Sequence, residues 1–143
     1  MERFEYPVRL EAAEEGGFVV TCRDLPPLVT QGEDETDALA QAADAMDEVF
    51  AIYMDEGLDF PAPSKPRKGE YRVSPPAETV AKAALHSAMR AAHVSKVELA
   101  KRMGVDEKEV RRLLDPHHGS KLPRIAEAVQ ALGQRLVIGL EPA

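Results

Sequence analysis

The sequence of 143 residues predicts an α+β fold, with a small N-terminal sheet-plus-helix domain and an all-α helix-turn-helix C-terminal domain that has a terminal strand. Three observations support this prediction. Apolar residues alternate with polar ones near the N-terminus and then follow a helical stripe. Prolines gather in the middle of the chain, and a spacing typical of a helix-turn-helix follows them. We therefore expect an acidic β-β-β-α domain at 1–60, a Pro-rich basic linker at 61–75, and the helix-turn-helix domain at 76–143.

The N-terminal strands are predicted from the alternation. Apart from Pro7, the first strand alternates charged residues with four apolar ones, a pattern of a half-buried edge strand: Phe4, Tyr6, Val8 and Leu10. Gly16-Gly17 is a turn signal, and the apolar run 18–22 follows it, so the two strands are expected to form a hairpin. Residues 28–31 can form a short third strand before Gly32.

A long helix is expected next. Asp34 is a suitable N-cap with Asp37 three residues on, and Gly57 is a natural stop. One apolar stripe runs between them: Ala38, Ala42, Met46, Val49 and Tyr53, supported by Leu39 and Phe50. The opposite face is polar and mostly acidic: Gln41, Asp44, Asp47, Glu48 and Asp55. One helix on a small sheet is a minimal two-layer domain.

The middle of the chain reads as a stiff linker, because five of the 11 prolines fall within 60–76 together with the basic residues Lys65, Arg67 and Lys68. Residues 71–73 can add a short strand. Pro76 suits the first turn of a helix that runs to about Ala92.

The segment Lys96–Asp115 carries the strongest functional signal. A helix-turn-helix needs a small residue where two helices cross, a glycine at the turn and a β-branched residue that fixes the second helix. Ala100, Gly104 and Val110 stand at the fifth, ninth and fifteenth positions of this segment, a spacing like that of phage repressors. Ser95 and Asp106 can cap the two helices. An ordinary helical hairpin is the alternative.

In a helix-turn-helix the second helix enters the major groove, where side chains read bases or contact phosphates. The candidate DNA-binding residues follow from position and charge: Lys96, Glu107, Lys108, Arg111, Arg112 and Lys121. Lys101, Arg102 and Arg124 are further phosphate candidates. Residues 135–140 read as a strand that can pair with a second copy, which gives a dimer, or pack back on its own domain.

The net charge of −7 divides unevenly. Residues 1–63 hold 16 acidic and three basic residues, net −13, whereas 64–143 hold nine acidic and 15 basic, net +6. Opposite signs suggest one basic and one anionic partner, although acidic helices can simply be soluble surfaces. No apolar run is long enough for a membrane span or a signal peptide, so we expect a cytoplasmic protein without membrane contact.

No enzyme, metal or cofactor site is expected. The single Cys22 cannot form an internal disulfide, and His117-His118 lack the further ligands that a zinc site needs. A two-metal nuclease needs converging carboxylates, starting in the middle of the first strand, which offers only Tyr6, Pro7 and Val8.

Four N-terminal runs share a pattern with a known family: Gly17–Val20, Asp24–Pro26, Val29–Gly32 and Ala38-Leu39. They resemble the N-terminal domain of HicB antitoxins and, with the helix-turn-helix, the resemblance covers nearly the whole chain. It departs at Pro27-Leu28, where the family usually has Gly and a small residue or Cys. The resemblance implies a partial RNase H-like N-terminal fold that covers HicA, a small basic mRNA-cleaving toxin. It also implies a C-terminal domain that represses the operon encoding both the toxin and the antitoxin.

Candidate toxin-binding residues follow from that resemblance and from the acidic charge. Leu25 and Leu28 would supply the buried centre of the interface. The charge partners would be Asp24, Asp44, Asp47 and Glu48. Two other functions stay open: a stand-alone transcription regulator without a toxin, and an adaptor whose helix-turn-helix binds only protein.

Overall fold

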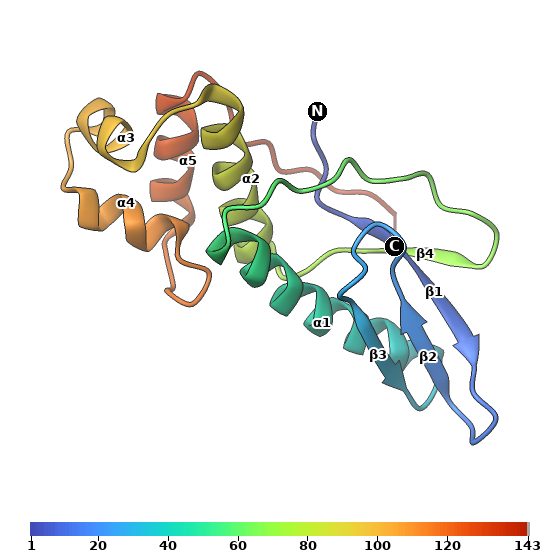
Figure 1. The fold of residues 1–143 in the computed structure, drawn as a ribbon. Helices are drawn as coiled ribbons and strands as arrows, with labels where there is room; N and C mark the ends of the chain where they lie inside the picture. The colour runs from blue at the N-terminus through green and yellow to red at the C-terminus, as the bar shows by residue number, and fades with distance from the viewer. Residues whose placement is uncertain (143) are drawn as a thin grey trace. The chain divides into compact units, whose positions relative to one another are not determined.

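The computed structural model describes residues 1–142, so Ala143, the last residue of the predicted third segment, lies outside the described residues. The chain divides into two compact units, Met1–Val80 and Ala81–Ala143, which are considered separately below. Figure 1 shows a sheet with one long helix in the first unit and a group of shorter helices in the second.

The first unit contains a four-stranded antiparallel sheet in the order β3-β2-β1-β4. Its strands are β1 Tyr6–Ala12, β2 Phe18–Thr21, β3 Val29–Gly32 and β4 Glu70–Val73. The three predicted N-terminal strands are confirmed. The prediction that the first is an edge strand is wrong, because β4 pairs with it from the other side, with Tyr6 opposite Val73. Part of the expected linker 61–75 therefore belongs to the sheet.

Helix α1, Glu35–Asp55, crosses one face of this sheet (Figure 1). Its start is capped as predicted: Asp37 N–H donates to Asp34 Oδ1 at 2.8 Å, and Glu33 N–H donates to Asp37 Oδ2 at 2.8 Å. The apolar stripe is buried at Ala38, Ala42, Met46, Val49 and Phe50. The face toward the sheet thus drives the docking of the helix, since burying a large apolar side chain is worth about 1.5–3 kcal/mol.

Aromatic rings continue this core to the chain that follows α1. The rings of Tyr6 and Phe50 meet edge to face at 5.9 Å, and Phe60 lies 4.6 Å from Phe50. The Tyr6 hydroxyl donates to the carbonyl of Pro61 at 2.8 Å, so its buried polar atom has a partner. Burial raises the pKa of this hydroxyl well above its usual range.

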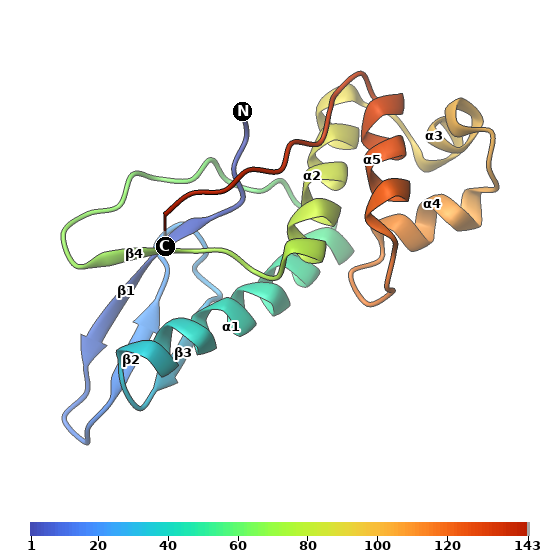
Figure 2. The same cartoon turned by 180° about the vertical axis from the view of Figure 1, so that it is seen from behind.

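The second unit is helical. Helix α2 spans Ala77–Ala92, so its first four residues belong to the first unit and the rest to the second. Three shorter helices follow: α3 Lys96–Met103, α4 Glu107–Leu114 and α5 Leu122–Ala131. Both views show α5 between α2 and the α3–α4 pair (Figures 1 and 2). Leu85, Leu99, Val110, Leu113 and Ile125 form the centre of their common core.

The strand expected at 135–140 is not formed in this single chain, where residues 134–142 are neither helix nor strand. Leu136 packs partly against the helical core, whereas Val137, Ile138 and Leu140 are 54%, 73% and 102% exposed. A strand needs a hydrogen-bonding neighbour, and none of the described residues provides one here. No helix within residues 1–142 is long and apolar enough to cross a membrane.

Candidate functional site

Helices α3 and α4 form the turn that the sequence predicts. The Ser95 side chain caps α3 by accepting from Glu98 N–H at 3.1 Å, and Asp106 caps α4 by accepting from Lys108 N–H at 3.1 Å. Between them Gly104 adopts the left-handed conformation, with φ 68° and ψ 34°, and its N–H bonds back to carbonyls of α3. A side chain would be strained at such a φ, which explains why the position needs glycine.

The other two positions of the signature are confirmed as packing residues. Ala100 is 5% exposed and Val110 is fully buried, so α3 and α4 meet through a small and a β-branched side chain. Leu113 completes the buried side of α4.

The opposite side of α4 carries the candidate base-reading residues. Lys108, Arg111 and Arg112 are exposed, and Glu107 is half-buried. Arg111 Nη2 donates to Glu107 Oε1 at 2.8 Å across one helical turn, so these two side chains form a pair on the surface. An arginine can donate two hydrogen bonds to guanine, and a glutamate can accept from cytosine.

Two further candidates lie at the starts of α3 and α5, and two others form ion pairs with nearby glutamates. Lys96 and Lys121 are exposed at the starts of α3 and α5, as phosphate contacts would require. Arg124 instead pairs with Glu109 at 2.5 Å and Glu127 at 2.8 Å, and the hydrogen bond to Glu109 raises the pKa of its guanidinium. Arg102 similarly pairs with Glu98 on α3.

A buried lysine, which the sequence reasoning missed, supports the end of α4. Lys82 on α2 is 2% exposed, and its Nζ donates to the carbonyls of Arg112 at 2.9 Å and Leu113 at 3.2 Å, and to Ser120 Oγ at 2.9 Å. Both carbonyls belong to the last turn of the helix, where the regular helical pattern of hydrogen bonds ends, and the Arg112 carbonyl also accepts from the Asp115 N–H at 3.3 Å. A cation also suits the negative end of the helix dipole. The sequence does carry one sign of this role: Lys82 lies three residues before Leu85 and therefore on the same, buried face of the helix.

The first unit places the predicted toxin-binding residues in two groups. Asp44 and Glu48 are exposed on α1. Asp24 accepts from Ser64 N–H at 2.8 Å and Ser64 Oγ at 2.6 Å, and Asp47 accepts from the Thr79 hydroxyl, so both carboxylates already hold internal partners.

The two leucines expected at the centre of an interface belong to the protein core. Leu25 is 0% and Leu28 is 1% exposed. The turn between β2 and β3 directs them inward, with Leu25 N–H bonded to the carbonyl of Cys22 and Leu28 N–H to that of Leu25. In this conformation neither side chain can contact a partner, which corrects the expectation from the sequence.

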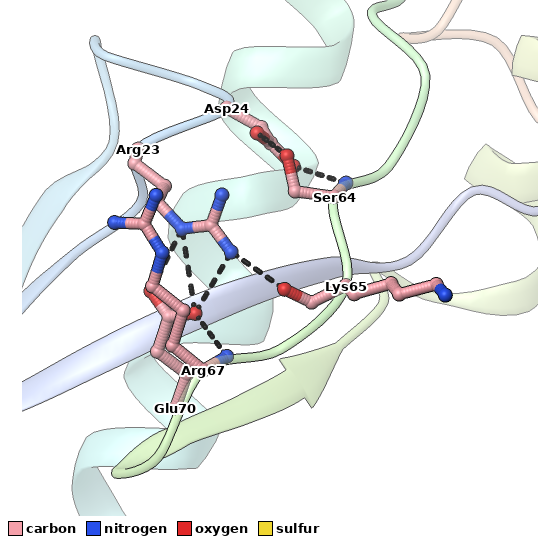
Figure 3. Close-up of polar contacts among 6 residues, drawn as sticks. All are labelled: Arg23, Asp24, Ser64, Lys65, Arg67 and Glu70. Carbon is pink, nitrogen blue, oxygen red and sulfur yellow. Dashed lines mark hydrogen bonds and ion pairs between the residues drawn. The ribbon is translucent and has the colours of Figure 1, made fainter.

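An ion-pair network fastens the segment after α1 to this same turn (Figure 3). Arg23 donates to Glu70 through Nε at 3.0 Å and Nη2 at 3.0 Å, and Nη2 also donates to the carbonyl of Lys65 at 2.7 Å. Arg67 N–H donates to Glu70 Oε1 at 2.7 Å. The hydrogen bonds from Arg23 and Arg67 lower the pKa of Glu70 to about 2. The network holds the start of β4 beside β1.

Comparison with known proteins gives a consistent result. The family model described as "HicB_like antitoxin of bacterial toxin-antitoxin system" matches residues 5–84. "Antitoxin HicB 1" of Photorhabdus laumondii is 33% identical over 141 residues, which is 99% of this chain and 90% of the relative. "Antitoxin HicB" of Escherichia coli is 34% identical, over 92% of this chain and 95% of its own length. "Antitoxin HicB" of Pseudomonas fluorescens is 36% identical, over 98% and 96%.

Proposed function

This chain belongs to the HicB-like antitoxin family of bacterial toxin–antitoxin systems, and from that premise we propose that it neutralises a HicA-like mRNA-cleaving toxin and represses its own operon. The similarity extends over nearly the whole length of the relatives, and this observation carries the proposal. The chain acts as a binding protein in the cytoplasm, where both mRNA and operator DNA are found.

Repression is proposed to use the face of α4. Arg111, positioned beside Glu107, reads a base, and Lys108 and Arg112 contact bases or phosphates. Lys96 and Lys121 bind phosphates on either side. The second unit has seven acidic and 11 basic residues, net +4, so its charge favours DNA.

A dimer is proposed to supply the second recognition helix. Proteins of this type bind two half-sites about 34–36 Å apart, which a single chain cannot cover. The exposed segment 137–140 gives a two-fold contact, because its backbone and apolar side chains can pair with the same segment of a second copy.

Toxin neutralisation is proposed for the first unit. It holds 18 acidic and seven basic residues, net −11, which complements a basic ribonuclease. Asp44 and Glu48, exposed on α1, steer the encounter, as charges at the rim of an interface do. Asp24 contributes by holding the loop residue Ser64, and Asp47 by holding Thr79 at the start of α2.

Co-expression of the full chain with a HicA-like toxin, taken from an open reading frame for a small basic protein next to its gene where one is found, tests both activities. We expect that protein alone to stop growth, the pair to grow, and the purified chain to shift its own promoter in preference to random DNA. Promoter binding without rescue of growth would favour a stand-alone regulator. Rescue without any promoter preference would contradict the repressor part.

A further inference from the structure

Strand β3 leaves one edge of the sheet open. It is the terminal strand in the order β3-β2-β1-β4 and pairs only with β2 among the described residues. Val29 stands opposite Thr21 and Gln31 opposite Val19, whereas Thr30 stands opposite the fully buried Val20. Because side chains alternate between faces, Val29, Gln31 and Val19 lie on the sheet face turned away from α1.

Strand β3 itself carries none of the charges or prolines that protect many edge strands, and Pro26-Pro27 and Glu33 lie outside it. Natural edges carry charges, prolines or covering segments that prevent pairing with another chain. The other edge strand, β4, has two charged residues among four. Strand β3 reads Val29-Thr30-Gln31-Gly32 without a charge, and Val29 is 64% exposed. An uncharged open strand with an exposed valine is a suitable template for strand addition.

Acidic side chains gather at one end of β3. A Cβ on Gly17 would lie 2.5 Å from the carbonyl oxygen of Gly32 and 3.5 Å from the Cα of Glu33, so the turn between β1 and β2 lies against the end of β3. Glu14 and Glu15 in this turn are exposed, and so is Glu33. An uncharged strand with an acidic border matches the common plan of an interface, a less charged centre with a polar rim.

We propose that the open edge of β3 is the docking site for the basic HicA-like toxin, which adds one strand to the sheet there. This inference rests on the proposed antitoxin function and names its contact surface. Main-chain hydrogen bonds to β3 supply the centre, Val29 is covered by the partner, and Glu14, Glu15 and Glu33 attract its cations. Pairing of two β3 edges from two copies is disfavoured, because it would bring together two units of net charge −11.

The test measures toxin affinity for the full chain and two single variants. Val29→Lys places a positive charge against a basic partner and should weaken binding by roughly 100-fold, because like charges at an interface cost several kcal/mol. Val29→Thr keeps the β-branched shape and should change the dissociation constant by less than about threefold. Ala62→Lys makes the same charge change at an exposed position of the same unit and is the matched control, with a similarly small effect.

Amide hydrogen exchange then tests strand addition itself. On toxin binding, amides within 29–32 should exchange at least about tenfold more slowly, whereas those of 70–73 at the other edge should keep their rates. Equal binding by Val29→Lys and Ala62→Lys, or unchanged exchange in β3, would overturn the docking site. If the wild-type chain bound no toxin, the proposed function itself would fail.

Discussion

Replacing Lys82 by methionine tests whether the buried ammonium stabilises the end of α4. Methionine keeps a long unbranched side chain but removes the donors to the carbonyls of Arg112 and Leu113 and to the Ser120 hydroxyl. The substitution therefore changes hydrogen bonding with little change in volume.

The expected loss of stability follows from these three bonds. The carbonyl of Leu113 loses its buried partner, which costs about 1–3 kcal/mol. The carbonyl of Arg112 keeps the Asp115 N–H at 3.3 Å and the Ser120 hydroxyl at 3.4 Å, so its loss is about 1 kcal/mol. Removing the desolvation cost of the lysine returns part of this, on the order of 1–2 kcal/mol. We expect a net destabilisation of about 1.5 kcal/mol and a fall in Tm of roughly 6–12 °C for a unit of this size.

Thermal unfolding of the full chain, followed by circular dichroism, measures this change. Lys121→Met is the matched control, because Lys121 is exposed and makes no side-chain capping bond, and its effect should stay within about 0.5 kcal/mol. Ser120→Ala removes only one of the three partners and should fall between the two. If Lys82→Met unfolded at the same temperature as Lys121→Met, the capping role of Lys82 would be refuted.

Three other predictions concern the turn between α3 and α4, the Arg23–Glu70 ion pair and the proposed DNA contacts. Gly104→Ala should cost about 1–2 kcal/mol in a denaturant titration, since φ is 68° and the space around the position is open. Glu70 has a pKa of about 2 in the folded chain against 4.5 ordinarily, so its pairing with Arg23 stabilises the fold above about pH 4.5, and this contribution disappears as the pH falls toward 2. An acid titration of Glu70→Gln should lack that component, and an unchanged profile would contradict the pairing. Arg111→Ala should cost about 1–3 kcal/mol of promoter binding and relax base preference, whereas Lys121→Ala should weaken all sequences equally and reduce the salt slope by about one.

Local patterns were sufficient for most of the elements. The alternation in 4–10, the stripe of α1 and the caps at Asp34, Ser95 and Asp106 act through neighbours close in sequence, and each is confirmed. The signature of Ala100, Gly104 and Val110 is also local, because it describes two helices joined by one turn.

Long-range pairing was harder to predict. Strand β4 has only four residues, and its partner β1 lies more than 60 residues earlier, so no short pattern connects them. The ion pair Arg23–Glu70, which links the start of β4 to the turn after β2, joins residues that are 47 positions apart in the sequence. Lys82 was missed because its partners are backbone carbonyls, which leave no trace in side-chain patterns.

The burial of Leu25 and Leu28 has a similar cause. Prolines interrupt the strand pattern beside both residues, so no periodicity assigns either side chain to a face of the sheet. Their direction is set by the backbone hydrogen bonds of the turn. An apolar residue in a Pro-rich turn can equally serve a core or an interface, and only the fold distinguishes the two.

In the proposed complex with DNA, the pairing of charges on α4 would limit how strongly this helix attracts DNA regardless of base sequence. Glu107 and Glu109 are each bound to an arginine, Arg111 and Arg124, so two of the cations are partly neutralised before DNA arrives. Within residues 1–142 no carboxylate pairs with the other four candidate DNA-binding cations: Lys96, Lys108, Arg112 and Lys121. Each phosphate neutralised contributes about −0.9 to the slope of log K against log salt, so four contacts in one half-site give a slope of roughly −4 and the proposed dimer roughly −7. These contacts would bind any DNA sequence equally. In the proposed repressor the preference for a promoter therefore comes from base contacts, for which Arg111, held beside Glu107 on the exposed side of α4, is the first candidate.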